Sequence, residues 1–483
     1  MPPASNVKPH LLRAAAVAAS VALSVLTTPL GAQTSDPSGH WEGSIEAPGQ
    51  PLVVMVDLEQ IDGAWSGTID IPAQGADDLP LSAVTVDGET VQFTISGLQG
   101  EPTFDGTLAD GEISGEFRQG GARLPFKLGR EAVAVEAPPR PQEPKPPFPY
   151  DEEEVEYTNG DVTIAGTLTL PPGAGRVPAA LLISGSGALN RDLELAGHKP
   201  FLVLADHLTR LGVAVLRVDD RGVGGSTGST WQSTSRNKAH DVLAGVRFLH
   251  AHDRIDAERI GLIGISEGGL VAPLALNRVP PGTVAFAVLL AGPAVPGGDL
   301  LRQQLRRIAA ANGAPAEKIE ELAALQDRAL EIIGSEMPPA EAEAALREVG
   351  AEQLAASPEM AQLGDEDLES ALSAAVESNL SPWFRFFIRY DPAPALGGLA
   401  VPTLALFGGK DTQVDADQNQ SAMEAAFVGS SNTDITVRRF PEMNHLFQTA
   451  GTGSPAEYAQ IEETMAPEVL DLIGSWIVER FVD

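Results

Sequence analysis

Five near-continuous apolar runs constrain the fold of this chain more than any other feature of its sequence. Such runs are typical of strands that are buried on both faces, as in a parallel sheet. Segments with the apolar spacing of helices lie between the runs, and this alternation indicates the βαβ units of an α/β domain. The five runs are 177–184, 213–219, 259–265, 284–292 and 401–408. Residues 152–483 are therefore predicted to form a mostly parallel sheet flanked by helices.

The sequence before this region has a different pattern. Between residues 39 and 130, short runs alternate apolar and polar residues and are punctuated by Gly, Asp and Pro, as in antiparallel strands. We predict a small all-β sandwich or barrel. It carries Trp41 and Trp65 but no cluster of acids and histidines, so we assign no chemistry to it. We interpret it as a stabilising accessory domain, with a ligand-binding or dimerising module as the alternative; the oligomeric state, including a homodimer, stays open.

Two segments outside these domains have distinctive compositions. Seven of the twelve residues at 138–149 are proline, which favours an extended, semi-rigid chain, so 131–151 is predicted to be a linker. At the N-terminus, basic residues and a histidine precede an apolar run at 14–26, and small residues lead to Ala32. Residues 1–32 therefore resemble a signal peptide, and export to the periplasm or the medium is expected. An uncleaved anchor is the alternative.

Composition excludes several classes of function. The chain has no cysteine, so disulfides, a thiol nucleophile and cysteine-ligated zinc are excluded. Its net charge is −34, from 66 acidic and 32 basic residues, and such a surface repels nucleic acids and anionic lipids at long range. We therefore expect a small-molecule partner, with no nucleic acid and no membrane contact beyond export.

One insertion interrupts the alternation of strands and helices. Residues 299–380 are rich in Ala, Leu and Glu at helical spacing, and they fall between the fourth and fifth apolar runs. An insertion at the C-terminal end of a sheet strand lies over the usual ligand crevice, so we predict a helical cap at 299–390. A helical bundle packed elsewhere is the alternative. The aromatic cluster at 383–390 either lines an acyl pocket or packs in the core.

The pattern G-x-S-x-G, which surrounds the nucleophile in many serine hydrolases, occurs twice. Residues 224–228 follow an apolar run but lead into a polar, β-branched segment that does not favour a helix. Residues 264–268 follow the run at 259–265 directly and precede an apolar segment compatible with a helix. A nucleophile elbow requires this strand–turn–helix frame, because its sharp turn presents the serine at a helix N-terminus. Ser266 is therefore the predicted nucleophile, rather than Ser226.

A serine nucleophile needs a base and an acid, which follow a nucleophile elbow in the order acid, then histidine. Of 8 histidines, only His445 comes after Ser266, and it lies just before the predicted C-terminal helix. Asp411 directly follows the fifth apolar run, so we predict that it orients His445. Asp415 and Asp417 are rivals, but they fall where a helix is expected to begin.

The oxyanion formed during acyl transfer needs N–H donors. The residue after the nucleophile, Glu267, is predicted to supply one. The loop SGSGALNRD after the first apolar run is predicted to supply the other, from Ser186 or else from Gly185. The pattern S-x-x-K at 235–238 also occurs in penicillin-binding proteins, but the sequence lacks the K-T-G motif that accompanies it there, so we give it no role.

The motifs SGSGALNRD, VDDRGVGGSTG, GISEGG, FGGKDTQV and MNHLF, in this order, resemble those of bacterial serine carboxylesterases of the EstD type. These are relatives of the prolyl-oligopeptidase and dienelactone-hydrolase branches of the α/β-hydrolase fold. The resemblance covers roughly residues 150–298 and 385–483. It implies an α/β-hydrolase fold and the hydrolysis of short-chain or aryl esters without a metal or cofactor.

The resemblance extends to single residues. Ser266, Asp411 and His445 match the catalytic triad of the family position by position. The family's oxyanion loop usually begins His-Gly-Ser-Gly, whereas Ser184 stands here in place of the histidine, so only the Gly-Ser-Gly part carries over. The Asp-Arg-Gly at 220–222 matches a family marker to which we give a structural role.

These observations predict a serine hydrolase that cleaves carboxylic esters through an acyl-enzyme intermediate, with a small-molecule ester as its partner. An exported aminopeptidase or peptidase acting on small peptides or amides is the main alternative, because an acidic cap residue would hold a substrate amine. An acyl thioesterase is disfavoured, since export separates the protein from coenzyme A and its charge repels that polyanion. A non-catalytic binding protein is disfavoured by the complete, correctly ordered triad.

Overall fold

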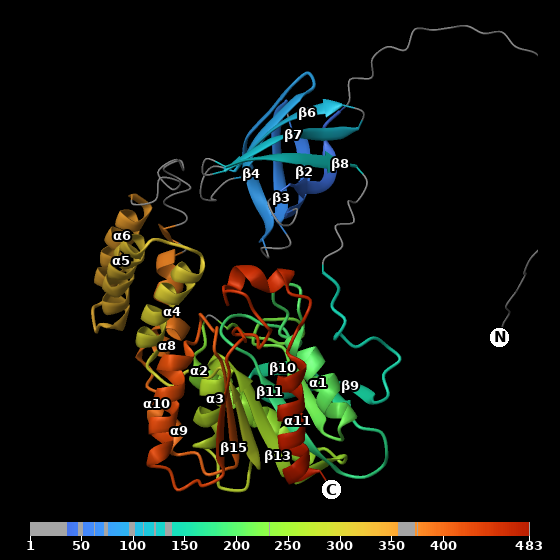
Figure 1. Cartoon of the computed structure of the whole chain (residues 1–483), viewed down its shortest axis with the longest axis vertical. Helices are drawn as coiled ribbons and strands as arrows, with labels where there is room; N and C mark the ends of the chain where they lie inside the picture. The colour runs from blue at the N-terminus through green and yellow to red at the C-terminus, as the bar shows by residue number, and fades with distance from the viewer. Residues whose placement is uncertain are drawn as a thin grey trace, which may run out of the picture.

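The computed structural model describes residues 36–482, apart from 47–51, 62, 72–75, 96–101, 110, 120–121, 131–137, 231, 356–371 and 374. The signal peptide predicted at 1–32 lies outside the described residues. Figure 1 shows an all-β body formed by the N-terminal part of the chain and a larger α/β body formed by the remainder.

The all-β body is a closed antiparallel barrel, which confirms the predicted all-β domain. Each strand pairs with its neighbours along the chain, and the first strand pairs with the last to close the barrel. Its strands are β1 (Gly39–Ile45), β2 (Leu52–Ile61), β3 (Ala64–Ile71), β4 (Ala76–Asp87), β5 (Thr90–Ile95), β6 (Thr103–Ala109), β7 (Glu112–Gln119) and β8 (Ala122–Gly129).

Large apolar side chains fill the interior of the barrel. Phe104 is fully buried, and its ring centroid lies 4.7 Å from that of Phe93 and 4.9 Å from those of Phe117 and Phe126. Trp41 is also buried in this cluster and donates its indole N–H to the carbonyl of Pro37 at 2.8 Å. The inward-facing residues therefore form a packed core, as in other small eight-stranded barrels.

The proline-rich segment lies against the α/β body. The Arg140 guanidinium donates to the carbonyl of Ile461 at 2.6 Å and to that of Ala459 at 2.7 Å. Gln142 donates its side-chain amide to the carbonyl of Met465 at 2.6 Å. Two side chains thus bind the described part of the linker to the backbone at 459–465.

The α/β body is built on a sheet of eight strands, which confirms the predicted α/β fold. Its order is β16-β15-β14-β13-β11-β12-β10-β9, with antiparallel pairing of β9, β10 and β12 at one side and parallel pairing elsewhere. The strands are β9 (Asp151–Asn159), β10 (Val162–Leu170), β11 (Val177–Ile183), β12 (Ala214–Val218), β13 (Ile255–Ile265), β14 (Phe286–Leu290), β15 (Thr403–Gly408) and β16 (Ile435–Phe440).

Helices connect and cover the strands of this sheet. Within the sheet domain, α2 packs beside α3, and α1 packs beside α11. None of the helices that the structure describes combines the length and the apolar composition needed to cross a bilayer. The helices outside the insertion are α1 (Pro200–Arg210), α2 (Ser235–Ala251), α3 (Glu267–Leu276), α9 (Ala393–Gly397), α10 (Ala416–Val428), the 3-10 helix η3 (Pro455–Gln460) and α11 (Pro467–Phe481).

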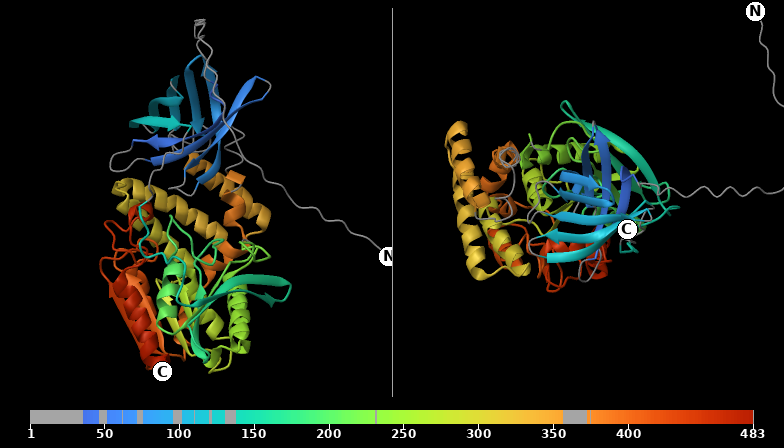
Figure 2. Two further views of the ribbon diagram at one scale, coloured as in Figure 1. Left: turned by 90° about the vertical axis from the view of Figure 1, so that its right-hand side faces the viewer. Right: turned by 90° about the horizontal axis from the view of Figure 1, so that it is seen from above.

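The helical insertion lies between β14 and β15. It contains α4 (Gly297–Ala311), α5 (Ala316–Gly334), α6 (Pro339–Ala355) and α8 (Pro382–Arg389). α4 packs against α5 and α8, and α5 packs against α6. Figures 1 and 2 show α5 and α6 on the outer side of this group, with α4 and α8 nearer the sheet. The first and last helices of the insertion are therefore the ones placed to reach the strand ends.

A buried carboxylate, paired with a half-buried arginine beside the sheet, makes the stability of the α/β body sensitive to acid. The Asp219 carboxylate accepts hydrogen bonds from the Arg191 side chain at 2.8 and 3.2 Å and from the backbone N–H groups of Arg191 and Gly225. Burial alone would raise the pKa of Asp219, but these hydrogen bonds outweigh it and hold the pKa below its ordinary value of 3.8. Asp219 therefore stabilises the fold at neutral pH, and this contribution is lost as the pH falls below about 4.

We expect Asp219→Asn to lower the free energy of unfolding by about 2 kcal/mol at neutral pH, because Arg191 then loses its buried partner and keeps only the exposed Glu154, at 2.6 Å. Urea unfolding at neutral pH and at about pH 3 checks this. The difference between the two pH values should be smaller in the variant than in the parent protein, because the titrating carboxyl is gone. An unchanged difference would contradict the linkage.

Candidate active site

Ser266 lies at the turn between β13 and α3. Its φ of 55° and ψ of −125° place a non-glycine residue in a strained, sparsely populated backbone region. The chain crosses itself closely here, because a Cβ atom on Gly264 would lie 2.1 Å from the carbonyl oxygen of Gly268. The Ser266 N–H donates to the carbonyl of Leu290 at 2.8 Å and fixes the turn against β14. The glycines and this hydrogen bond hold the serine at the N-terminus of α3.

The serine of the second G-x-S-x-G pattern has a different environment. Ser226 is buried, and its hydroxyl donates to the carbonyl of Asp219 at 2.8 Å. The same oxygen accepts the N–H of Ala165 at 2.9 Å. The hydroxyl thus joins a turn to β10, and both of its hydrogen-bonding functions are used within the fold.

His445 and Asp411 form a buried pair. His445 Nδ1 lies 2.7 Å from Asp411 Oδ2, and the two side chains are 6% and 0% exposed. The other carboxylate oxygen, Oδ1, accepts the backbone N–H groups of Gln413 and Val414, each at 2.8 Å. With Nδ1 donating its proton to the carboxylate, Nε2 of the neutral imidazole carries no proton and can accept one.

The rival carboxylates have other partners. Asp415 caps α10 by accepting the N–H of Gln418 at 2.9 Å, and it pairs with Arg307 at 2.5 Å. Asp417 is largely exposed and pairs with Arg439 at 2.6 Å. Asp411 is the carboxylate that the structure brings to the histidine.

Ser266 and His445 both line a cavity of about 330 Å³ at the C-terminal ends of the parallel strands. The insertion covers this cavity: α4 supplies Leu300 and Leu301, and α8 supplies Trp383, Phe384 and Phe387. Three side chains of the aromatic cluster therefore line the site, of which Phe387 is buried and the other two are half-buried. Among the described residues that line the cavity, none is Asp, Glu, Lys or Arg.

Two backbone N–H groups near Ser266 are candidate donors to an oxyanion. A Cβ atom on Gly185 would lie 3.2 Å from Ser266 Cβ and 3.7 Å from Ser266 Oγ, so the loop after β11 passes close to the Ser266 side chain. The next residue, Ser186, lines the cavity. Within the described residues, no protein acceptor takes the N–H of Ser186 or that of Glu267. These are the N–H groups that the sequence assigned to an oxyanion.

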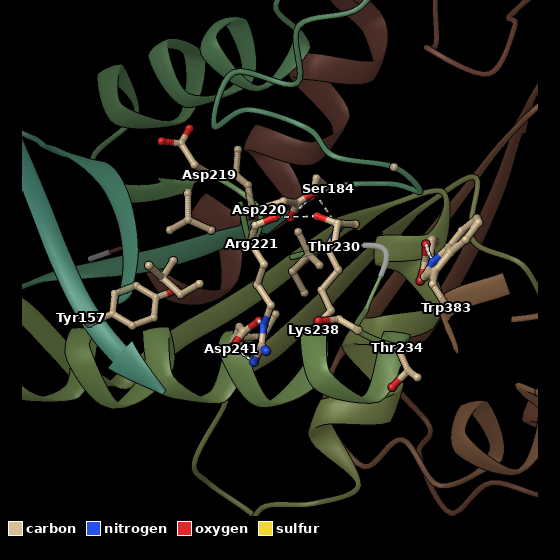
Figure 3. A pocket seen from close by; sticks show the side chains of 18 residues that line it. Tyr157, Ser184, Asp219, Asp220, Arg221, Thr230, Thr234, Lys238, Asp241 and Trp383 are labelled. Carbon is tan, nitrogen blue, oxygen red and sulfur yellow. Dashed lines mark hydrogen bonds and ion pairs between the residues drawn. The ribbon is translucent and has the colours of Figure 1, made fainter. Parts of the chain in front are cut away.

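The side chain of Glu267 was not singled out by the sequence. It is buried, and its carboxylate accepts the Ser235 hydroxyl at 2.6 Å and the Trp383 indole N–H at 3.0 and 3.1 Å. Trp383 also lines a smaller cavity of about 50 Å³, whose lining Figure 3 shows. The signal for Ser235 was the S-x-x-K pattern, which sequence reasoning could only compare with an unrelated family.

This chain is similar to several known proteins. Esterase EstD of Thermotoga maritima is 23% identical over 449 residues, which cover 92% of each chain. Among solved structures, an esterase of Pyrococcus furiosus is 18% identical with a TM-score of 0.43, covering 69% of this chain and 92% of its own. An acetyl xylan esterase from Paenibacillus is 17% identical with a TM-score of 0.40, covering 70% of this chain and 86% of its own. Residues 180–461, more than half of the chain, match the Alpha/beta hydrolase family, and the chain therefore belongs to that family.

Proposed function

We propose that this protein hydrolyses carboxylic esters through an acyl-enzyme intermediate on Ser266. The observation that carries the proposal is the combination at one cavity of a strained serine at a helix N-terminus and a histidine paired with a buried carboxylate at 2.7 Å. The full-length similarity to an esterase supports the same reaction class.

The proposed reaction has two halves. Ser266 Oγ attacks the ester carbonyl carbon while His445 Nε2 takes the hydroxyl proton, and Asp411 stabilises the imidazolium that forms. The N–H groups of Ser186 and Glu267 stabilise the tetrahedral oxyanion. The intermediate then expels the alcohol, which receives the proton from His445. Water attacks the acyl-enzyme with His445 again as base, which releases the acid and regenerates Ser266.

The lining of the cavity favours a neutral, apolar substrate. Its walls are mostly aliphatic and aromatic, with Ser186, Gln304 and Gln413 as uncharged polar residues, and its volume lies at the lower end of the range for small-molecule sites. An unpaired charge is costly to bury in such an environment. A free substrate amine would find no carboxylate among the described lining residues, whereas a short or aromatic acyl group would bury its apolar surface. The cavity thus supports an esterase over the aminopeptidase alternative.

A comparison of initial rates tests this proposal. We expect the purified protein to turn over p-nitrophenyl acetate and butyrate at least about 100-fold faster than amino-acid p-nitroanilides, because a charged amine must be desolvated without a partner. Anilides whose amino group is blocked serve as the control for the leaving group and the amide bond. Faster turnover of the free-amine anilides than of the esters would contradict the proposal and favour an aminopeptidase.

A further inference from the structure

A lysine binds the carbonyl oxygen of the peptide unit that carries the Ser186 N–H. Lys238 Nζ donates to the carbonyl oxygen of Gly185 at 2.9 Å. This peptide bond is trans, because the cis bond among the described residues is Pro146-Pro147. In a trans peptide, the C=O of one residue and the N–H of the next point in opposite directions. Fixing the Gly185 carbonyl on Lys238 therefore directs the Ser186 N–H away from α2, on the side where Ser186 lines the catalytic cavity.

Lys238 is itself fixed by a buried carboxylate. Its Nζ lies 3.0 Å from Asp220 Oδ2. Asp220 also accepts the Ser184 hydroxyl at 2.8 and 2.9 Å and the N–H of Leu189 at 3.3 Å. Figure 3 shows Ser184, Asp220 and Lys238 together at the smaller cavity. The Asp220 carboxylate thus binds both ends of the loop 184–189 and also binds the lysine that holds the Gly185 carbonyl.

The same turn of α2 also reaches the second N–H donor. Ser235 and Lys238 are three residues apart and therefore lie on the same face of the helix. The Ser235 hydroxyl donates to the Glu267 carboxylate at 2.6 Å, next to the nucleophile. Thr234 and Asn237 form a capping box that fixes where α2 begins. Both N–H donors are thus supported by one well-anchored helical turn.

We propose that Lys238, held by Asp220, is a positioning residue for the oxyanion hole of this enzyme, and that Ser235 supports the second donor through Glu267. The inference rests on the proposed ester hydrolysis. Lys238 acts in two ways: it sets the direction of the Ser186 N–H, and its positive charge polarises the Gly185–Ser186 peptide, which strengthens that N–H as a donor. The S-x-x-K pattern thereby acquires a role unrelated to nucleophilic catalysis by its serine.

The test replaces Lys238 by methionine, which keeps the length of the side chain and removes its donors. We expect kcat for p-nitrophenyl butyrate to fall about 10- to 100-fold, with KM changed less than about 2-fold, because only the transition state carries the oxyanion. Affinity for a butyl trifluoromethyl ketone, which forms a tetrahedral oxyanion on the serine, should fall by a similar factor. Affinity for a neutral butanamide, which forms no tetrahedral oxyanion, should stay unchanged.

The matched control is Asp241→Asn, which breaks an ion pair of similar burial on the same helix. Asp241 pairs with Arg221 at 2.6 and 2.8 Å and makes no contact with the Gly185 carbonyl. We expect a lower thermal midpoint with kcat within about 2-fold of the parent. The lost ion pair stabilises the fold but does not orient the N–H groups that bind the oxyanion. If Lys238→Met does not fold, Asp220→Asn replaces it, with an expected loss of about 3- to 10-fold in kcat, because the amide oxygen still accepts from Ser184.

Distinct results overturn the two proposals. An unchanged kcat in Lys238→Met or, if that variant does not fold, in Asp220→Asn overturns the positioning role. So does a loss of kcat without weaker binding of the trifluoromethyl ketone, or an equal loss in Asp241→Asn. A parent protein that turns over no ester overturns the proposed function instead. Ester turnover by the parent is therefore measured before the variants.

Discussion

Replacing Ser266 by alanine is expected to lower kcat for p-nitrophenyl esters by about 10⁴- to 10⁶-fold. The alanine keeps the cavity and the two N–H donors but removes the oxygen that forms the acyl-enzyme in the proposed mechanism, so the residual rate should reflect binding and oxyanion stabilisation alone. Steady-state rates on p-nitrophenyl butyrate measure this loss. Mass spectrometry of the protein after a rapid quench should show the added acyl group in the parent and none in the variant.

The second G-x-S-x-G pattern supplies a control within the same chain. Ser226→Ala leaves the N–H of Ala165 without its acceptor, so we expect a loss of about 1–2 kcal/mol in the free energy of unfolding. Its kcat should stay within about 2-fold of the parent. The assignment of the nucleophile is wrong if Ser266→Ala remains active, and reversed if Ser226→Ala alone is inactive.

The strands of the sheet differ in how readily the sequence reveals them. β11 to β15 are buried on both faces, so they read as apolar runs and were predicted. β9 was missed because its sequence, DEEEVEYTN, is acidic and mostly exposed, as befits a strand at the edge of the sheet. β10 was missed although it is buried, because its Thr and Gly residues interrupt the apolar run. A position at the edge of the sheet and buried Thr residues both shorten the apolar runs from which strands are predicted.

In the candidate site, too, some residues can be predicted from local sequence patterns and others cannot. Ser266 follows from a local strand–turn–helix pattern, and Asp411 and His445 follow from chain order and strand ends. The support around them does not, because it joins residues far apart in the sequence: Trp383 contacts Glu267 across 116 positions, and Lys238 contacts Gly185 across 53. Each of these contacts depends on how α2 and the insertion pack on the sheet. A single sequence contains no pattern that predicts such packing.

Replacing Asp411 by asparagine is expected to lower kcat by about 10⁴-fold with little change in structure. The reason lies in the two N–H groups of Gln413 and Val414, which both donate to Asp411 Oδ1. In the variant, the amide oxygen is held at that position, so the amide NH₂ faces His445. Because an NH₂ group can only donate there, Nδ1 of the imidazole must accept, and its proton moves to Nε2. Nε2, which takes the serine proton in the proposed mechanism, then already carries a proton and can no longer act as the base.

Asp415→Asn is the matched control for this argument. It is a buried aspartate four residues further on, and asparagine preserves the cap of α10 because its oxygen still accepts the N–H of Gln418. Only the charge opposite Arg307 is lost, so we expect kcat within about 2-fold of the parent. Stopped-flow acylation rates for both variants decide the matter. A loss in Asp415→Asn that matches the loss in Asp411→Asn would mean that negative charge near the site, rather than the tautomer of His445, limits the reaction.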